Sequence, residues 1–183
     1  MDFSNTMPLD VLLTQLRSSL PDSIPDIPDV VIGDLISFIS KGPSHVRTYC
    51  KGWYKDYDFF EVTFPVARFG YLKEIDLTEY SVMVGRHSQL PDPLPENLEA
   101  LALSTMLKMK GTLYDLGELF FTQLLHVLGL DDSVDFSDPH LWVCSSGDEH
   151  IMKSVNCLWR PDLKVVAPID IVASPYFRLV NWG

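Results

Sequence analysis

Residues 57–84 read YDFFEVTFPVARFGYLKEIDLTEYSVMV, and this stretch decides the fold class. Aromatic and β-branched side chains dominate it, and Gly70 and Gly85 mark its turns, which is typical of β-strands. Pro65 interrupts the first apolar run, so we expect that strand at a sheet edge or with a bulge. The stretch therefore predicts strands of an antiparallel or mixed sheet.

Around this β-rich stretch, four segments are expected to be helices. The first follows Thr6, where leucines recur at helical spacing: Leu9, Leu12, Leu13, Leu16 and Leu20. The others cover Asp29–Ser40, about Pro95–Lys110, and Thr112–Gly129. The last part is expected to be β-rich, with a turn at Ser145–Asp148 and an apolar tail docked on the body.

The whole sequence therefore predicts a single α+β domain of 183 residues, with about four helices packed on an antiparallel or mixed β-sheet. Its expected parts are helical over 6–42, β-rich over 49–85, helical over 95–130 and β-rich over 140–183.

Composition limits the classes of function. Apolar residues make up 46% of the chain and the net charge is −11, which describes an acidic globule that repels nucleic acid phosphates and gives no support to membrane contact. The three cysteines are an odd number, and we find no signal peptide and no membrane-spanning stretch. We therefore expect a soluble, intracellular, cytoplasmic protein.

Motifs for catalysis, nucleotides and metals are absent from the sequence. There is no G-x-S-x-G and no phosphate-binding loop. The residues 131–142 alternate oxygen ligands, but Phe136 and Trp142 occupy the positions where an EF-hand needs Gly and Glu. His126 has no second ligand at helical spacing. We therefore predict no catalytic residue, no metal ligand and no cofactor.

The most suggestive surface interleaves basic and aromatic side chains, as protein contact sites do. It comprises Arg47, Tyr49, Lys51, Trp53, Tyr54 and Lys55, and the apolar tail adds Tyr176, Phe177 and Trp182. The same pattern fits a connector whose aromatics join the core, or single-stranded nucleic acid. We expect a non-enzymatic acidic interaction or assembly protein that binds protein partners or copies of itself.

Two other functions remain open. One is a thiol hydrolase that uses Cys144 or Cys50 with a nearby histidine. Cys50 follows His45 by five residues, and His150 could face Cys144 across a short hairpin. The other is an acidic inhibitor that neutralises a basic partner.

The segment from Gly117 to Gly129, GELFFTQLLHVLG, resembles a helix of rhabdovirus matrix proteins. That resemblance implies a compact α+β protein that self-associates, as a viral structural protein does. The acidic N-terminus departs from the basic arm of those proteins.

Overall fold

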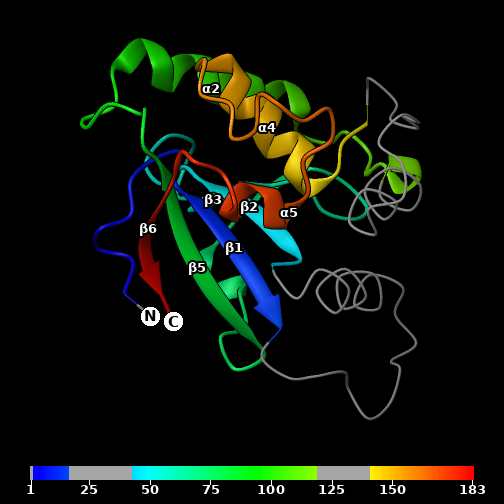
Figure 1. Ribbon diagram of the computed structural model, residues 1–183. Helices are drawn as coiled ribbons and strands as arrows, with labels where there is room; N and C mark the ends of the chain where they lie inside the picture. Colours follow the sequence, from blue (N-terminus) through cyan, green and yellow to red (C-terminus); the bar gives the residue numbers. More distant parts are fainter. Residues whose placement is uncertain (1, 17–42, 119–140) are drawn as a thin grey trace.

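A six-stranded antiparallel sheet dominates the computed structural model, which describes residues 2–16, 43–118 and 141–183 (Figure 1). The strand order is β4-β3-β2-β1-β5-β6. The strands are β1 (Val11–Leu16), β2 (His45–Tyr49), β3 (Phe59–Glu61), β4 (Arg68–Gly70), β5 (Tyr80–His87) and β6 (Phe177–Trp182).

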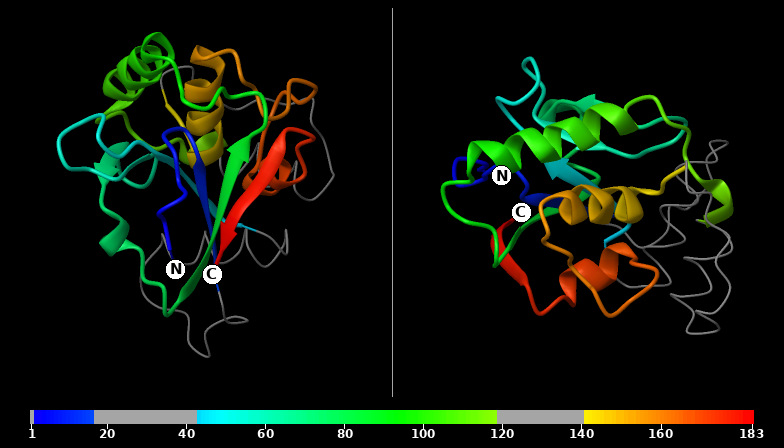
Figure 2. Two further views of the ribbon diagram at one scale, coloured as in Figure 1. Left: turned by 90° about the vertical axis from the view of Figure 1, so that its left-hand side faces the viewer. Right: turned by 90° about the horizontal axis from the view of Figure 1, so that it is seen from above.

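Helices lie over one face of the sheet, as two further views show (Figure 2). They are α2 (Glu96–Met109), α4 (Cys144–Ser154) and the short α5 (Pro168–Val172), and a 3-10 turn covers Leu72–Glu74. The larger hydrophobic core joins this helical layer to the sheet, and a smaller cluster includes Leu12, Phe59 and Val84 on the opposite face.

The predicted fold class is wrong in its balance of elements. Four helices on a sheet were expected, whereas the described residues form a sheet-dominated fold with three short helices. The leucine-rich segment expected as the first helix contains β1. Val11, Leu12 and Leu13 are all fully buried, because β1 is a central strand with apolar side chains on both faces. Such a run also satisfies a helical pattern.

The second correction concerns the C-terminal part. The expected turn at Ser145–Asp148 lies inside α4, and the part expected to be β-rich over 140–183 also contains α5. β2 was not predicted as a strand at all.

Several other elements are confirmed. A helix over about Pro95–Lys110 is present as α2, and the β-rich stretch supplies β3, β4 and β5. The expected edge strand or bulge at Pro65 is not found, because Pro65 lies outside the strands, between β3 and β4. The apolar tail docks on the body as β6, which pairs with β5. The expected helix at 29–40 lies outside the described residues, as does the matrix-like segment from residue 119 onward.

Candidate functional site

The candidate site lies where α4 begins against the sheet. α4 packs on β2 and β3. Two features set the distance between the helix and the sheet. The Thr48 hydroxyl donates to Asp148 Oδ1 at 2.6 Å. Gly147 has no side chain at the point where a Cβ would collide with Val62. The first residue of α4 is therefore held against the end of β2.

That first residue is Cys144, and its thiol is shielded. The residue is only 4% exposed. The backbone N–H groups of Val46 and Ser145 lie close enough to the sulfur to favour the thiolate. Burial raises the pKa of the thiol to about 11, although the two N–H groups and the positive charge of Arg47 act in the opposite direction. At neutral pH the resting cysteine is therefore a thiol.

The direction of the Val46 N–H places the sulfur beside β2. Tyr49 N–H donates to Asp10 O on the β1 side, whereas Cys50 N–H donates to Asp58 O on the β3 side. Since N–H groups alternate along a strand, Val46 also donates towards β3. The last β2–β3 pair is Arg47 with Glu61. The thiol therefore lies on the β3 side of Val46, beyond the last β2–β3 pair.

His45 and Glu61 form an oriented pair. His45 Nε2 lies 2.9 Å from Glu61 Oε2, and the Glu61 side chain is 2% exposed. Burial opposes ionisation of Glu61, but the hydrogen bond from His45 and the charges of Arg47 and Arg68 more than offset it, so the pKa of Glu61 lies below its usual value. Glu61 is therefore an ionised acceptor, so Nε2 carries the hydrogen. Nδ1 is left as the basic nitrogen.

Arginines surround the same carboxylate. Arg47 Nε lies 2.9 Å from Glu61 Oε2, and Arg68 Nη2 lies 2.8 Å from Oε1. The Arg68 guanidinium continues to Glu74 at 3.1 Å. Burial and the charge of Arg47 lower the pKa of His45, against the hydrogen bond to Glu61. The imidazole is therefore neutral at pH 7.

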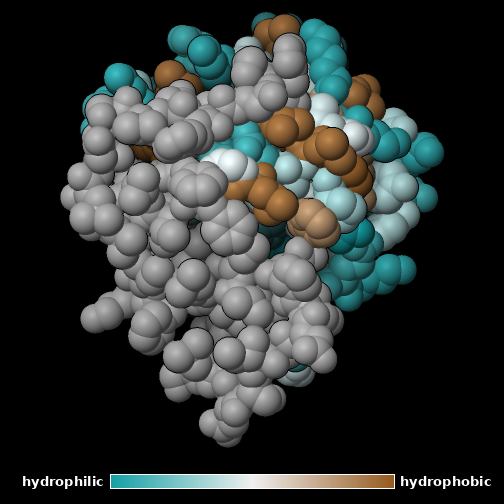
Figure 3. Space-filling view, turned by 90° about the vertical axis from the view of Figure 1, so that its right-hand side faces the viewer, coloured by the Kyte–Doolittle hydropathy of each residue, from teal (hydrophilic) through white to brown (hydrophobic). Residues whose placement is uncertain are grey.

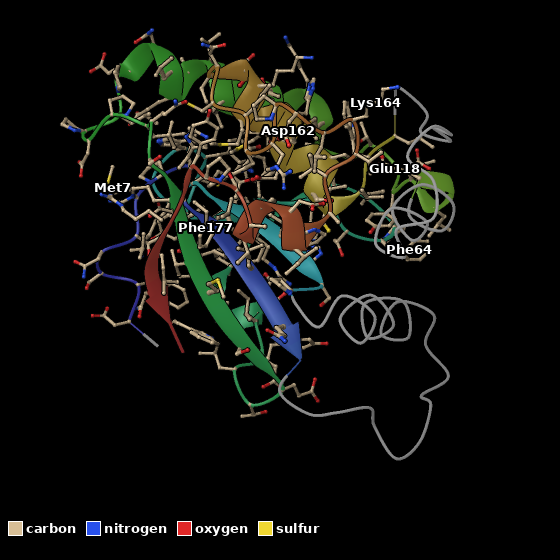
Figure 4. All side chains as sticks on the ribbon, viewed as in Figure 1. Met7, Phe64, Glu118, Asp162, Lys164 and Phe177 are labelled. Carbon is tan, nitrogen blue, oxygen red and sulfur yellow. The ribbon has the colours of Figure 1, made fainter. Side chains whose placement is uncertain are left out.

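A second carboxylate supports the start of α4 from the other side. Ser146 Oγ accepts the Val143 N–H at 3.1 Å and donates to Glu118 Oε2 at 3.1 Å. The charge of Glu118 raises the pKa of Cys144. Figure 4 labels Glu118 and Phe64 on this side of the molecule.

Exposed apolar side chains flank this end of the sheet. Phe64, Leu113 and Leu116 are 46%, 59% and 40% exposed. Backbone hydrogen bonds connect their segments to the start of α4: Tyr114 N–H to Pro65 O at 3.1 Å and Asp115 N–H to Trp142 O at 2.9 Å. Apolar surface is visible on this face (Figure 3).

The expected contact residues are spread over different environments. Tyr49 is buried, Arg47 is largely buried in the pair with Glu61, and Lys51 and Lys55 are exposed. Trp53 and Tyr54 are half-buried and pack against the main core. Tyr176 stacks on the His87 ring, Phe177 faces Trp159, and Trp182 is 63% exposed.

The structure pairs the cysteines and histidines differently from both expected pairs. Cys50 is fully buried, and burial raises the pKa of its thiol to about 12. His150 lies on the same helix as Cys144, and its ring packs on Trp142 at 4.4 Å. Instead, Cys144 interacts with Arg47, which lies 2.9 Å from the same Glu61 oxygen as His45. His126, His140 and the acidic loop at 131–138 lie outside the described residues.

Metal clusters and membrane-spanning helices are absent from the described ranges. In residues 2–16, 43–118 and 141–183, no three His, Cys, Asp or Glu side chains gather as metal ligands. Within the same ranges, no helix has the length and apolar character needed to cross a membrane.

Comparisons with known proteins bear on the fold alone. No family model matches the chain, and no curated protein matches its sequence. Among solved structures, the chain is similar to the crystal structure of the metalloprotein YiiX from Escherichia coli O157:H7, described as DUF1105. The two share 13% identity and a TM-score of 0.61, and the match covers 96% of each chain.

Proposed function

We propose that the protein is a thiol-dependent hydrolase or acyltransferase, with Cys144 as the nucleophile, His45 as the general base and Glu61 as the group that orients the imidazole. One observation carries this proposal. The Cys144 thiol at the start of α4 interacts with the charge of Arg47, and both Arg47 Nε and His45 Nε2 lie 2.9 Å from the same oxygen of the ionised Glu61. A nucleophile, a base and an orienting group are the parts that covalent acyl transfer needs.

In this proposal each atom has a role. His45 Nδ1 takes the thiol proton as the sulfur of Cys144 attacks the carbonyl carbon of an ester, thioester or amide. The developing oxyanion can bind the Cys144 N–H at the start of α4, where the helix dipole favours negative charge. The leaving group then takes the proton from His45, and water or a second nucleophile releases the acyl group.

Alkylation at each cysteine tests the proposal. A small reagent, iodoacetamide, is suited to a thiol that is 4% exposed. We expect Cys144 to react faster at pH 7 than Cys50 or Cys157, which are internal controls in the same chain. His45→Gln should slow labelling of Cys144 at least about tenfold, because the proton acceptor is lost. Peptide mass spectrometry gives the rate at each site.

Turnover gives the second readout. Cys144→Ala should abolish hydrolysis of a p-nitrophenyl ester, whereas Cys157→Ala should retain it. The proposal is rejected if Cys144 labels as slowly as Cys50 and His45→Gln changes nothing, provided that circular dichroism shows a folded variant.

An interaction role is a second candidate, supported by β6. β6 is an edge strand of the sheet, and two of its large apolar side chains, Leu179 and Trp182, are 51% and 63% exposed. Such a strand offers both backbone groups and apolar area to a protein partner or a second copy. Neither nucleic acid nor membrane is proposed as a partner.

We also infer a cytoplasmic location. All three cysteines are free and buried, which suits a reducing compartment.

A further inference from the structure

Arg47 is a largely buried part of the candidate site, unlike the surface contact residue that the sequence predicts. Its side chain is 17% exposed. Nη1 donates to Thr14 Oγ1 at 3.1 Å on the neighbouring strand β1, and the guanidinium lies 5.4 Å from the centre of the Phe59 ring. Hydrogen bonding, an aromatic face and burial thus fix this cation in one position.

Arg47 and His45 share one oxygen atom. Both Arg47 Nε and His45 Nε2 lie 2.9 Å from Glu61 Oε2. The two side chains stand on the same face of β2, because they are two residues apart on a strand. A full negative charge at that oxygen would favour an imidazolium, so a guanidinium at the same oxygen weakens this effect.

The charges packed around His45 balance when the imidazole is neutral. The positive groups are Arg47 on β2 and Arg68 on β4, and the negative groups are Glu61 on β3 and Glu74 on the 3-10 turn. Among the described residues, the Cys144 thiol on α4 interacts with Arg47, and Glu118 in turn acts on that thiol. A proton on His45 would leave one uncompensated positive charge in a buried cluster.

We propose that Arg47 is a positioning residue that keeps His45 neutral and in its Nε2–H form, by placing its positive charge close to the oxygen of Glu61 that orients the imidazole. This inference rests on the proposed function for its meaning, because a neutral Nδ1 is what the base needs to accept the thiol proton. The positive charge of Arg47 also favours the Cys144 thiolate once that proton has left.

Titration of His45 tests the proposal directly. The experiment uses the full chain with Cys144→Ser, so that the thiol does not titrate together with the imidazole. Long-range ¹H–¹⁵N spectra report both the protonation and the tautomer, and His45→Gln assigns the signal. Arg47→Gln should raise the pKa of His45 by about one pH unit, a tenfold change in the ratio of protonated to neutral imidazole.

Two variants act as matched controls. Arg47→Lys keeps a positive charge and should hold the pKa of His45 close to that of the parent. Arg68→Gln removes a cation from the other oxygen of Glu61 and from a side chain that is 49% exposed, so the pKa of His45 should rise less than half as far. If Arg47→Gln does not fold, Arg47→Met is used in its place, because the methionine side chain retains the contact with the Phe59 ring.

The result separates this inference from the proposed function. An unchanged or lower pKa of His45 in a folded Arg47 variant overturns the role of Arg47, whatever the cysteine does. Slow alkylation of Cys144 in the wild-type protein overturns the hydrolase, whatever the histidine titration shows. A raised pKa in Arg47→Gln that Arg47→Lys restores supports the role given to Arg47.

Discussion

Asp148 is a buried acid one helical turn after the candidate nucleophile. Its carboxyl group accepts hydrogen bonds from the Thr48 hydroxyl at 2.6 Å and from the Trp159 indole N–H at 2.8 Å. Burial raises its pKa to about 7, well above the ordinary 3.8, and the hydrogen bonds offset only part of this rise. The ionised form of Asp148 is therefore the costly one in the folded protein.

This raised pKa predicts how stability depends on pH. Because the folded-state pKa lies above the unfolded one, the contribution of Asp148 is fully present below about pH 4 and is lost as the pH rises to about 7. A pKa difference of one between the two states corresponds to about 1.4 kcal/mol at most. Urea denaturation of Asp148→Asn should show a smaller loss of stability between pH 5 and pH 7.5 than the wild type.

The exposed Asp56→Asn is the control for this measurement, because it removes a surface charge without altering a buried group. Equal pH slopes in Asp148→Asn and wild type would contradict the assignment.

The candidate site shows what single residues reveal in a sequence. Cys144 and His45 were each recognised as chemically capable, but their partners were chosen by proximity along the chain. The pairing proposed here depends on the packing of α4 on β2, which is tertiary information. Glu61 carried no signal, because a lone glutamate in an aromatic strand is usually solvated.

At the scale of elements, the composition of residues 144–154 did not predict the helix α4. Its buried positions include Cys144, Gly147, Asp148, Ile151 and Met152, which follow helical spacing. Gly147 and Asp148 are typical turn residues, although here they are the positions that let the helix approach the sheet. The prediction for the segment that contains β1 was wrong for a different reason. A strand buried on both faces has too many apolar residues to show the alternation typical of strands. α2 was predicted correctly because Pro95 marks its start and Gly111 marks its end.

Gly147 gives a prediction at this scale. Helix propensity alone would make Gly147→Ala more stable by up to about 1 kcal/mol. A Cβ at this position would collide with Val62 and lie 3.2 Å from Met109 Cε. We therefore expect a net loss of about 1–3 kcal/mol, as in other overpacked cores, measured by chemical denaturation.

The same substitution should also slow labelling of Cys144, because it lifts the start of α4 from β2. Lys153→Ala, at an exposed position of the same helix, should alter neither quantity by much. A Gly147→Ala variant that is more stable than the wild type would show that α4 does not need this close approach.

At the scale of the whole molecule, the open edge of β6 is the place to test association. Trp182→Ala should leave the free energy of unfolding nearly unchanged, because the side chain is 63% exposed. If β6 binds a second copy, sedimentation velocity should show a dimer in the wild type that Leu179→Ser with Trp182→Ala converts to monomer. Lys51→Ser with Lys55→Ala, exposed on a different loop, is the control. A wild type that stays monomeric at all concentrations removes self-association through β6.

The position of β1 has a consequence for how the chain reaches its final form. β1 pairs with β2 on one side and with β5 on the other, so the earliest strand in the sequence fills the centre of the sheet. Its ladders join Val11 to Thr48 and to Gly85, residues made much later during synthesis. A nascent chain must therefore carry an apolar, unpaired strand until both neighbours have emerged from the ribosome. Contacts this distant along the chain favour folding on the millisecond-to-second timescale. Binding of a chaperone to the unpaired β1 segment would compete with folding during that time.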